Sequence, residues 1–386
     1  MTYKIPLFDL NFDEAEEEAV LAVLRSKWIS MGPKTAELEQ RFADELGVRQ
    51  AVAVNSGTAA LHLALAALGV GEGDEVIVPS MTFVATVNAV RYVGATPIFA
   101  DITSLDDFSI DPEYVRAQIG PRTRAILPMH YGGFACDMRA LGAIVQEHKL
   151  LLIEDAAHAP ATWYEGRRVG TLGDAGCFSF FSNKNMTCAE GGMLVTNRED
   201  VAQRARLMRS HGMTTLSYER SRGHATYYDV VSAGWNYRLD DIRAALALMQ
   251  MEKLLPDASR RQELREYYVE SLRGTDGVRI PYLAHSYSAS NYIFPILVAE
   301  GGPERRDAIR NELARRGIQT SVHYPAVHRF SAYRRPERSL PKTEFIADQE
   351  ITLPLFGTLT EHQVDYIARC LAECLPSCAA RSQAPL

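Results

Sequence analysis

One lysine, one aspartate and one cluster of small residues have the types and spacing that amine chemistry requires. Lys184 follows a short apolar run, Asp155 ends another, and Ser56-Gly57-Thr58 separates a third run from a helical stretch. Burial disfavours the charged form of a lysine, so a lysine beside buried strands can act as a nucleophile or a base. A helix that begins at Gly57 would point backbone N–H groups at an anion such as phosphate.

Each feature alone also has an ordinary structural interpretation. Ser56 or Asp155 can cap a helix, and a lysine in a loop is usually solvated. Together, however, the three features match what pyridoxal 5′-phosphate needs, namely a lysine for a Schiff base, a carboxylate that keeps the pyridine nitrogen protonated, and a seat for the phosphate. The combination therefore predicts a pyridoxal-phosphate enzyme.

The elements expected to position these residues are those of an α/β fold. Short apolar runs alternate with helical stretches between about residues 50 and 210, which predicts a mainly parallel central sheet flanked by helices. The predicted strands are Ala51–Asn55, Glu75–Pro79, Thr96–Asp101, Arg124–Met129, Leu150–Glu154, Asp174–Phe180 and Met193–Thr196. The predicted helices are Thr58–Leu68, Thr82–Tyr92 and Ala140–His148. Ligands bind such sheets at the carboxyl ends of the strands, where Asp155 stands.

The pattern changes after residue 240 and predicts a smaller α+β domain. Its predicted elements are a helix over Asp240–Leu272, with a break at Pro256 as an alternative, strands over Asn291–Val298 and Gly317–His323, and a helix over Glu304–Arg316. We place the boundary near residue 250. This gives a large cofactor-binding domain over residues 1–250 and a small C-terminal domain over residues 251–386.

Composition excludes several classes of function. The 386 residues include 48 Asp and Glu against 41 Lys and Arg, a net charge of -7, which is unfavourable for a general binder of nucleic acid or anionic membranes. No stretch approaches the roughly 18 apolar residues that a membrane span needs, and the N-terminus lacks the pattern of a signal peptide. We therefore expect a cytoplasmic protein that acts on small molecules.

Cysteine usage agrees with that expectation. Six cysteines in a chain of this length do not form a disulfide framework. Cys370, Cys374 and Cys378 recur every four residues, but this spacing favours buried packing on a terminal helix over a metal site, and no metal is predicted.

The sequence strongly resembles the DegT/DnrJ/EryC1/StrS family of sugar aminotransferases, a branch of the fold-type I pyridoxal-phosphate enzymes. The resemblance covers nearly the whole chain. The motifs that carry it include Ser56–Leu61, Pro79–Thr86, Glu154–Ala159, Ser179-Phe180 before Lys184-Asn185, Glu190–Gly192, Gly234–Ile242 and Val322–Pro325. So many motifs in the family's order imply the family's fold and cofactor.

The resemblance also implies a role for individual residues. Lys184 matches the Schiff-base lysine, which also moves the substrate proton, and Asp155 matches the partner of the pyridine nitrogen. The matches to other cofactor contacts are His158 beside the ring oxygen, Phe83 stacked on the ring, and Gly57, Thr58 and Ser179 at the phosphate. Asn236 and Arg238 match residues that reach the phosphate from the second subunit of a homodimer.

The substrate is less sharply defined by the resemblance. It implies L-glutamate as amino donor and a nucleotide-linked 4-keto-6-deoxyhexose, such as dTDP-4-keto-6-deoxyglucose, as acceptor, because His158 and Met129–Gly133 resemble the branch that acts at C4. His323, Tyr324 and His328 match a substrate-side motif, although His328 fits an ordinary loop histidine equally well. The residues expected either to meet a diphosphate or to form a solvated basic patch are Arg329, Arg334 and Arg335.

Several alternatives remain at this stage. UDP-linked sugars, a 3-keto nucleotide sugar and a cyclitol ketone are substrates of the same chemistry. A dehydrating member of the family usually has histidine in place of Lys184, and a non-catalytic regulator would not need Lys184, Asp155 and Ser179 intact. A nicotinamide enzyme is disfavoured because no G-x-G-x-x-G motif follows the first strand.

Overall fold

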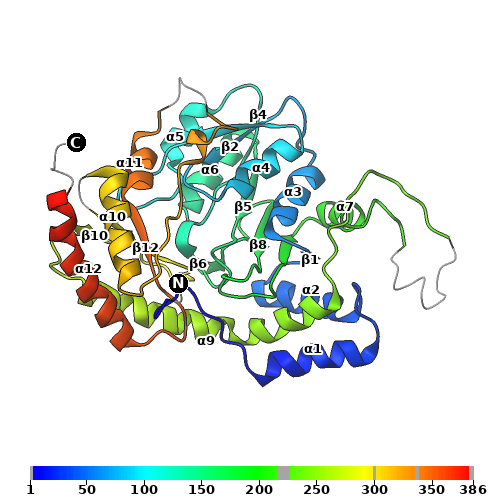
Figure 1. The fold of residues 1–386 in the computed structure, drawn as a ribbon. Coiled ribbons are helices and arrows are strands. Elements are labelled where there is room, and N and C mark those ends of the chain that lie inside the picture. Colours follow the sequence, from blue (N-terminus) through cyan, green and yellow to red (C-terminus); the bar gives the residue numbers. More distant parts are fainter. Residues whose placement is uncertain (1–2, 216–226, 299–300, 335–338, 382–386) are drawn as a thin grey trace.

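The computed structural model of the protein describes residues 3–215, 227–298, 301–334 and 339–381, the last six of these by their backbone alone (Figure 1). Its helices are α1 (Glu14–Ser26), α2 (Pro33–Leu46), α3 (Gly57–Ala67), α4 (Val84–Tyr92), α5 (Pro112–Gln118), α6 (Met138–His148), α7 (Glu199–Arg209), α9 (Asp241–Ser271), α10 (Gly302–Arg315), α11 (Pro341–Gln349) and α12 (Glu361–Arg381). Among these described helices, none is both long and apolar enough to cross a membrane.

A seven-stranded sheet forms the centre of the fold. Its order is β1-β9-β8-β5-β4-β2-β3, and its strands are β1 (Gln50–Val54), β2 (Glu75–Pro79), β3 (Thr96–Ala100), β4 (Thr123–Ile126), β5 (Leu151–Asp155), β8 (Ala175–Ser179) and β9 (Gly192–Thr196). Neighbouring strands are parallel except at β9, which is antiparallel to both β1 and β8. The predicted α/β class and mainly parallel sheet are therefore confirmed.

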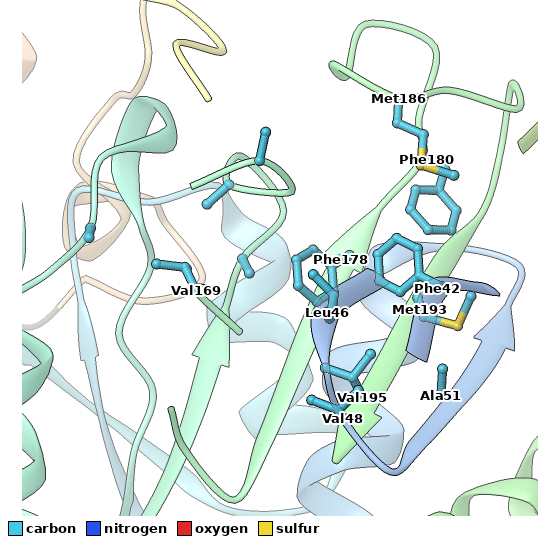
Figure 2. Close-up of a cluster of buried hydrophobic side chains, with 14 of the residues drawn as sticks. Phe42, Leu46, Val48, Ala51, Val169, Phe178, Phe180, Met186, Met193 and Val195 are labelled. Carbon is cyan, nitrogen blue, oxygen red and sulfur yellow. The ribbon is translucent and has the colours of Figure 1, made fainter. Parts of the chain in front are cut away.

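Both faces of the central sheet are buried, because successive residues of each strand pack into different cores. Leu152 belongs to the core beneath α2 and α9, whereas Ile153 belongs to the core beneath α3, α4 and α7. In the first core, the ring of Phe42 on α2 meets the edges of Phe178 and Phe180 at centroid distances of 5.2 and 5.6 Å (Figure 2). The alternation decides which side chains at the strand ends face which side of the sheet.

A second, three-stranded antiparallel sheet has the order β10-β11-β12, from β10 (Val278–Arg279), β11 (Phe294–Val298) and β12 (Glu350–Leu353). Helix α12 packs on it, and Cys370 and Cys374 are buried in its apolar core. The side chain of Cys378 lies outside the described residues. A two-stranded ribbon, β6 (Trp163–Tyr164) and β7 (Arg167–Arg168), completes the strands of the described ranges.

Helix α9 joins the two cores. Leu248 and Leu254 pack under the central sheet, while Leu264 and Tyr268 pack on the small one, so the helix runs from α1 and α2 to α12 (Figure 1). It continues through Pro256, and the alternative of a break there is wrong. Proline removes one backbone hydrogen bond, but apolar contacts on both sides of it hold the helix together. The predicted boundary near residue 250 falls inside this helix, and the division into domains 1–250 and 251–386 stays a prediction.

The predicted strand over Gly317–His323 is wrong. This segment makes isolated bridges to two different partners, Ile318 to Ile5 and Ser321 to Thr352. A run of apolar and β-branched residues forms a strand only when one neighbouring strand pairs with it over several residues. Here the pairing partner changes after three residues. The segment therefore passes between the N-terminal chain and β12 as an irregular connection.

One buried carboxylate, Glu154, fastens the loop that follows the β6–β7 ribbon to the end of β5. It accepts backbone hydrogen bonds from Gly170, Leu172 and Gly173 at 2.7, 2.6 and 2.7 Å. It also accepts one from Nε2 of His130 at 3.1 Å, because Nδ1 of that ring accepts the N–H of Cys136. A buried charge with four donors is fully paired, and it fixes the strand end that carries Asp155.

We predict that Glu154→Gln lowers the free energy of unfolding by about 2 kcal/mol, since the amide group turns a donor toward backbone N–H groups that need an acceptor. Denaturant unfolding measures this loss. The matched control is Glu147→Gln, which removes an exposed carboxylate paired with Arg116 and should change the unfolding free energy far less. Equal effects of the two substitutions would show that Glu154 does not hold this part of the fold.

Candidate active site

A cavity of about 360 Å³ opens at the carboxyl ends of the central strands, where the sheet meets the segment around residue 323. It brings together nine of the residues singled out from the sequence: Gly57, Thr58, Phe83, Asp155, His158, Ser179, Lys184, His323 and Tyr324. These residues come from the ends of β1, β2, β5 and β8 and from the irregular connection before β12. The strand ends that sequence patterns predicted to be neighbours do share one edge.

Asp155 is buried on the face of the sheet opposite to Glu154. Its carboxylate accepts hydrogen bonds from Oγ1 of Thr86 on α4 at 2.7 Å and from the N–H of Ala157 at 3.1 Å. Burial raises the pKa of Asp155 above its ordinary value, and these two donors and the nearby charge of Lys184 oppose that rise. A cation placed against this carboxylate would favour its ionised form.

Lys184 lies in the turn after β8, where its N–H donates to the carbonyl of Phe181 at 2.9 Å. Burial lowers the pKa of Lys184 to about 7, and the negative charge of Asp155 acts in the opposite direction. Its Nζ lies 4.2 Å from the ring centroid of Tyr292, a residue that sequence reasoning missed. Near neutral pH the amine therefore exists in both its neutral and its charged form, as a group that accepts and returns protons must.

The amino end of α3 forms one wall of the cavity. Oγ of Ser56 accepts the N–H of Ala59 at 3.1 Å and caps the helix, so the helix begins at Gly57 beside Ser179. Gly57 is required there, since a Cβ atom on it would lie 2.9 Å from that of Ser179, and a Cβ on Gly192 would lie 2.7 Å from the nitrogen of Gly57. The start of α3 and the hydroxyl groups of Thr58 and Ser179 thus form a binding site for an anion.

His158 and Tyr324 form a hydrogen-bonded pair on another wall. The N–H of Gly132 donates to Nδ1 of His158 at 3.3 Å, so the ring proton is on Nε2, which lies 2.9 Å from the hydroxyl of Tyr324. Burial, helped by the charge of Lys184, lowers the pKa of His158 well below its ordinary value and keeps the ring neutral. The Tyr324 hydroxyl accepts that proton, so its own hydrogen can be donated to a group in the cavity.

The structure does not bring His328 to this cavity. Its Nδ1 pairs with the hydroxyl of Ser80 at 2.7 Å and its Nε2 with Glu344 at 3.1 Å, so the buried ring connects β2 to α11. The alternative of an ordinary loop histidine describes it better than substrate binding. Arg329 pairs with Asp348 and Glu344, Arg334 does not line the cavity, and Arg335 lies outside the described residues.

Asn236 and Arg238 do not line the cavity of their own chain. They lie in the segment before α9, where Arg238 forms a backbone bridge to Val54 and the carbonyl of Asn236 accepts a hydrogen bond from Asn55. Asn236 is exposed.

Comparison with known proteins identifies the family. The model of the DegT/DnrJ/EryC1/StrS aminotransferase family matches residues 11–372. The chain belongs to this family. As the sequence predicted, it is an enzyme, a sugar aminotransferase of a family that depends on pyridoxal phosphate.

Solved structures similar to this aminotransferase agree in fold over almost their whole length. The Streptococcus pneumoniae protein Spr1654 is 31% identical, with a TM-score of 0.91 over 99% of this chain and 100% of that one, and it is also solved with pyridoxal phosphate and pyridoxamine phosphate. DesV from S. venezuelae is 35% identical over 100% of both chains, with a TM-score of 0.88. DesI, solved with its TDP-sugar product, is 31% identical over 99% of this chain and 94% of that one, with a TM-score of 0.86.

The cavity of this aminotransferase fits the cofactor on its own geometry. A buried carboxylate, an amine with a lowered pKa and a capped helix start lie around one space. They match the pyridine nitrogen, the carbonyl carbon and the phosphate of pyridoxal phosphate respectively. Lys184, Asp155 and the Gly57–Ser179 wall are therefore the residues that would hold it.

We predict that in the cofactor-free protein Lys184 loses its proton with a midpoint near pH 7, because burial lowers its pKa to about 7. Asp155→Asn removes the negative charge that favours the ammonium form, so the midpoint should fall further. Acetylation of lysines over a range of pH, followed by mass spectrometry of peptides, measures both values. Exposed Lys149 supplies the reference peptide, and a Lys184 midpoint no lower than that of Lys149 would contradict the prediction.

Proposed function

We propose that this aminotransferase moves an amino group from L-glutamate to a nucleotide-linked 4-keto-6-deoxyhexose, with dTDP-4-keto-6-deoxyglucose as the preferred acceptor. The observation that carries the proposal is His158, which resembles the residue of the C4-acting branch and lies in the cavity with Lys184. The similarity to DesI, whose structure was solved with its TDP-sugar product, supports a nucleotide-linked acceptor.

The proton transfers of such a reaction fall to Lys184. Pyridoxal phosphate supplies an electron sink for the carbon that loses a proton. With the cofactor bound, the neutral Nζ of Lys184 would be the group that takes up this proton and releases it again, because a pKa of about 7 gives both protonation states near neutral pH. Asp155, held by Thr86 and Ala157, would supply the negative charge that keeps the pyridine nitrogen protonated.

The acceptor sugar would lie against the wall formed by His323 and Tyr324. Both residues line the cavity, and the Tyr324 ring lies 5.9 Å from that of Phe83, the residue proposed to stack on the cofactor ring. A volume of about 360 Å³ is within the range of small-molecule sites, which starts at roughly 300 Å³. These contacts support binding of a ring with several hydroxyl groups next to the cofactor.

We also propose a homodimer in which each cavity is completed by Asn236 and Arg238 of the other subunit. Apolar side chains in the segment leading to these residues support an interface there, since Tyr227, Val230 and Val231 are 78%, 53% and 56% exposed. Burial and Arg209 lower the pKa of Arg238, yet its guanidinium keeps its charge at any physiological pH and suits a phosphate. The cytoplasmic location stays a prediction from the sequence.

If the sites are shared, subunits with complementary defects should restore each other. We predict that Lys184→Ala and Arg238→Ala proteins are each nearly inactive alone, and that co-expression of both with different tags yields about a quarter of the wild-type activity, because half of the dimers are mixed and each has one intact site. Activity of the unfractionated mixture measures this, and the purified doubly tagged fraction, in which every dimer has one of its two sites intact, should show about half of the wild-type activity. Mixed dimers as inactive as the parents would show that Arg238 does not act across subunits.

The substrate proposal predicts a specific product. Incubation of the holoenzyme with L-glutamate and a panel of ketones should give an aminated product from dTDP-4-keto-6-deoxyglucose, detected by mass spectrometry. The panel includes the UDP-linked 4-keto sugar, a 3-keto nucleotide sugar and a cyclitol ketone. Amination of the cyclitol alone, or of the 3-keto sugar alone, would replace the proposed acceptor while leaving the aminotransferase assignment intact.

A further inference from the structure

Strand β12 carries two polar side chains in a place where burial normally selects apolar ones. Glu350, Ile351, Thr352 and Leu353 are all completely buried. Ile351 and Leu353 face the core of the small sheet, so Glu350 and Thr352, two residues apart, share the other face. A buried carboxylate and hydroxyl require partners, and the partners found here belong to the wall of the active-site cavity.

These partners are the backbone and the ring of His323. The N–H of His323 donates to Oε2 of Glu350 at 2.7 Å, and Nδ1 of its ring lies 2.8 Å from Oγ1 of Thr352. Oγ1 of Thr352 lies 2.5 Å from Oε1 of Glu350. A continuous chain therefore runs from Glu350 through Thr352 to His323, whose ring also lines the cavity.

The backbone around the chain is held from both sides. Thr352 donates its N–H to the carbonyl of Ser321 at 2.9 Å and accepts the N–H of Ser321 at 3.1 Å. The backbone N–H and carbonyl of Thr352 are thus both used on the side of Ser321. The residue opposite Thr352 in β11 is Pro295, which has no N–H and therefore loses no hydrogen bond there. Tyr131 donates its hydroxyl proton to the carbonyl of His323, which fixes the connection from the side of the central sheet.

This chain of hydrogen bonds determines which nitrogen of the His323 ring carries a proton. Thr352 has a single hydroxyl proton, so it can donate toward Glu350 or toward His323 but not toward both. If Glu350 is ionised, Thr352 donates to it, Nδ1 of His323 must carry a proton, and Nε2 is an acceptor. If Glu350 is protonated, it donates to Thr352, Thr352 donates to Nδ1, and Nε2 carries the proton.

We propose that Glu350 and Thr352 are positioning residues that act through His323, and that the protonation of Glu350 decides whether Nε2 of His323 donates a hydrogen bond to the substrate or accepts one. One proton is lost between the two states. The Glu350 proton passes to Thr352, the Thr352 proton passes to Nδ1, and the Nε2 proton leaves through the cavity. The inference rests on the proposed function only where it names a sugar hydroxyl as the group that Nε2 meets.

The charges around the hydrogen-bond chain are compatible with this transfer of protons from Glu350 through Thr352 to His323, which we call the relay. Burial raises the pKa of Glu350 to about 8, opposed by Thr352, the N–H of His323, Arg306 and Arg310. Burial and the charge of Lys184 lower the pKa of His323 to about 3, so the ring stays neutral and only its tautomer can change. The other titratable groups near His323 in the described residues are His158, whose pKa is lowered by burial, and Tyr131, Tyr292 and Tyr324, whose pKa values are all raised by burial.

The test is nitrogen NMR of the histidine-labelled holoenzyme, because the two neutral tautomers of histidine have distinct ring-nitrogen spectra. His323→Gln assigns the signals. We expect the wild-type signal to change from the Nε2-protonated to the Nδ1-protonated form as the pH rises through about 8. A wild-type signal that keeps one tautomer through this range would overturn the proposal.

Variants separate the relay from a merely structural role. Glu350→Gln imitates the protonated carboxyl and should hold His323 in the Nε2-protonated form at every pH, whereas Thr352→Val should abolish the pH response and Thr352→Ser should restore it. Glu344→Gln is the matched control, since Glu344 pairs with His328 and should leave the His323 signal unchanged. A pH-dependent tautomer that survives in Glu350→Gln would refute the role of Glu350.

Steady-state kinetics with the keto-sugar that the enzyme aminates complete the test. Thr352→Val should raise KM for the sugar by about tenfold, the effect of one weakened hydrogen bond, with a smaller change in kcat. Tautomer switching without amination of any keto-sugar would leave the relay standing and remove the proposed substrate. Amination of the keto-sugar by a wild-type enzyme whose His323 keeps one tautomer would refute the relay and leave the proposed substrate standing.

Discussion

At the end of β5, the neighbouring carboxylates of Glu154 and Asp155 are buried on opposite faces of the central sheet. The period of two in a strand sends Glu154 toward the core beneath α2 and α9 and Asp155 toward α4 and the cavity. Each charge is stable only because its surroundings supply donors, and the donors of Glu154 are the backbone of the loop at 170–173. The position of Asp155 thus depends on contacts that never reach the cavity.

The same burial that demands these partners also sets the chemistry of the cavity. It lowers the pKa of Lys184 to about 7, and it keeps His158 and His323 neutral. Neutral histidines next to the lysine do not compete with it for a proton near pH 7. Burial also raises the pKa of Asp155, and the hydrogen bonds that Thr86 and Ala157 donate to it oppose that rise and favour the ionised form that a cationic partner needs.

Local patterns in the sequence predicted the seven strands of the central sheet, the helices α3, α4, α6, α9 and α10, and the residues nearest the cavity, because each of those signals lies within one element and the turn beside it. What the sequence did not show are contacts between segments far apart in the chain. Tyr292 beside Lys184, Thr86 beside Asp155 and Thr352 beside His323 all join different elements. The direction of β9 and the continuity of α9 through Pro256 likewise depend on tertiary packing, and His328 was misplaced because a motif position does not reveal which way a side chain turns.

The two histidines of the cavity show how tertiary contacts give similar side chains different roles. A backbone N–H, that of Gly132, fixes the tautomer of His158, and a backbone N–H cannot reverse its direction. A hydroxyl, that of Thr352, faces His323, and a hydroxyl donates or accepts according to its other partner. His158 therefore offers the cavity one constant pattern, suited to a cofactor that stays in place. In the proposed relay His323 offers a pattern that can change, which would suit a site that receives both an amino donor and a sugar.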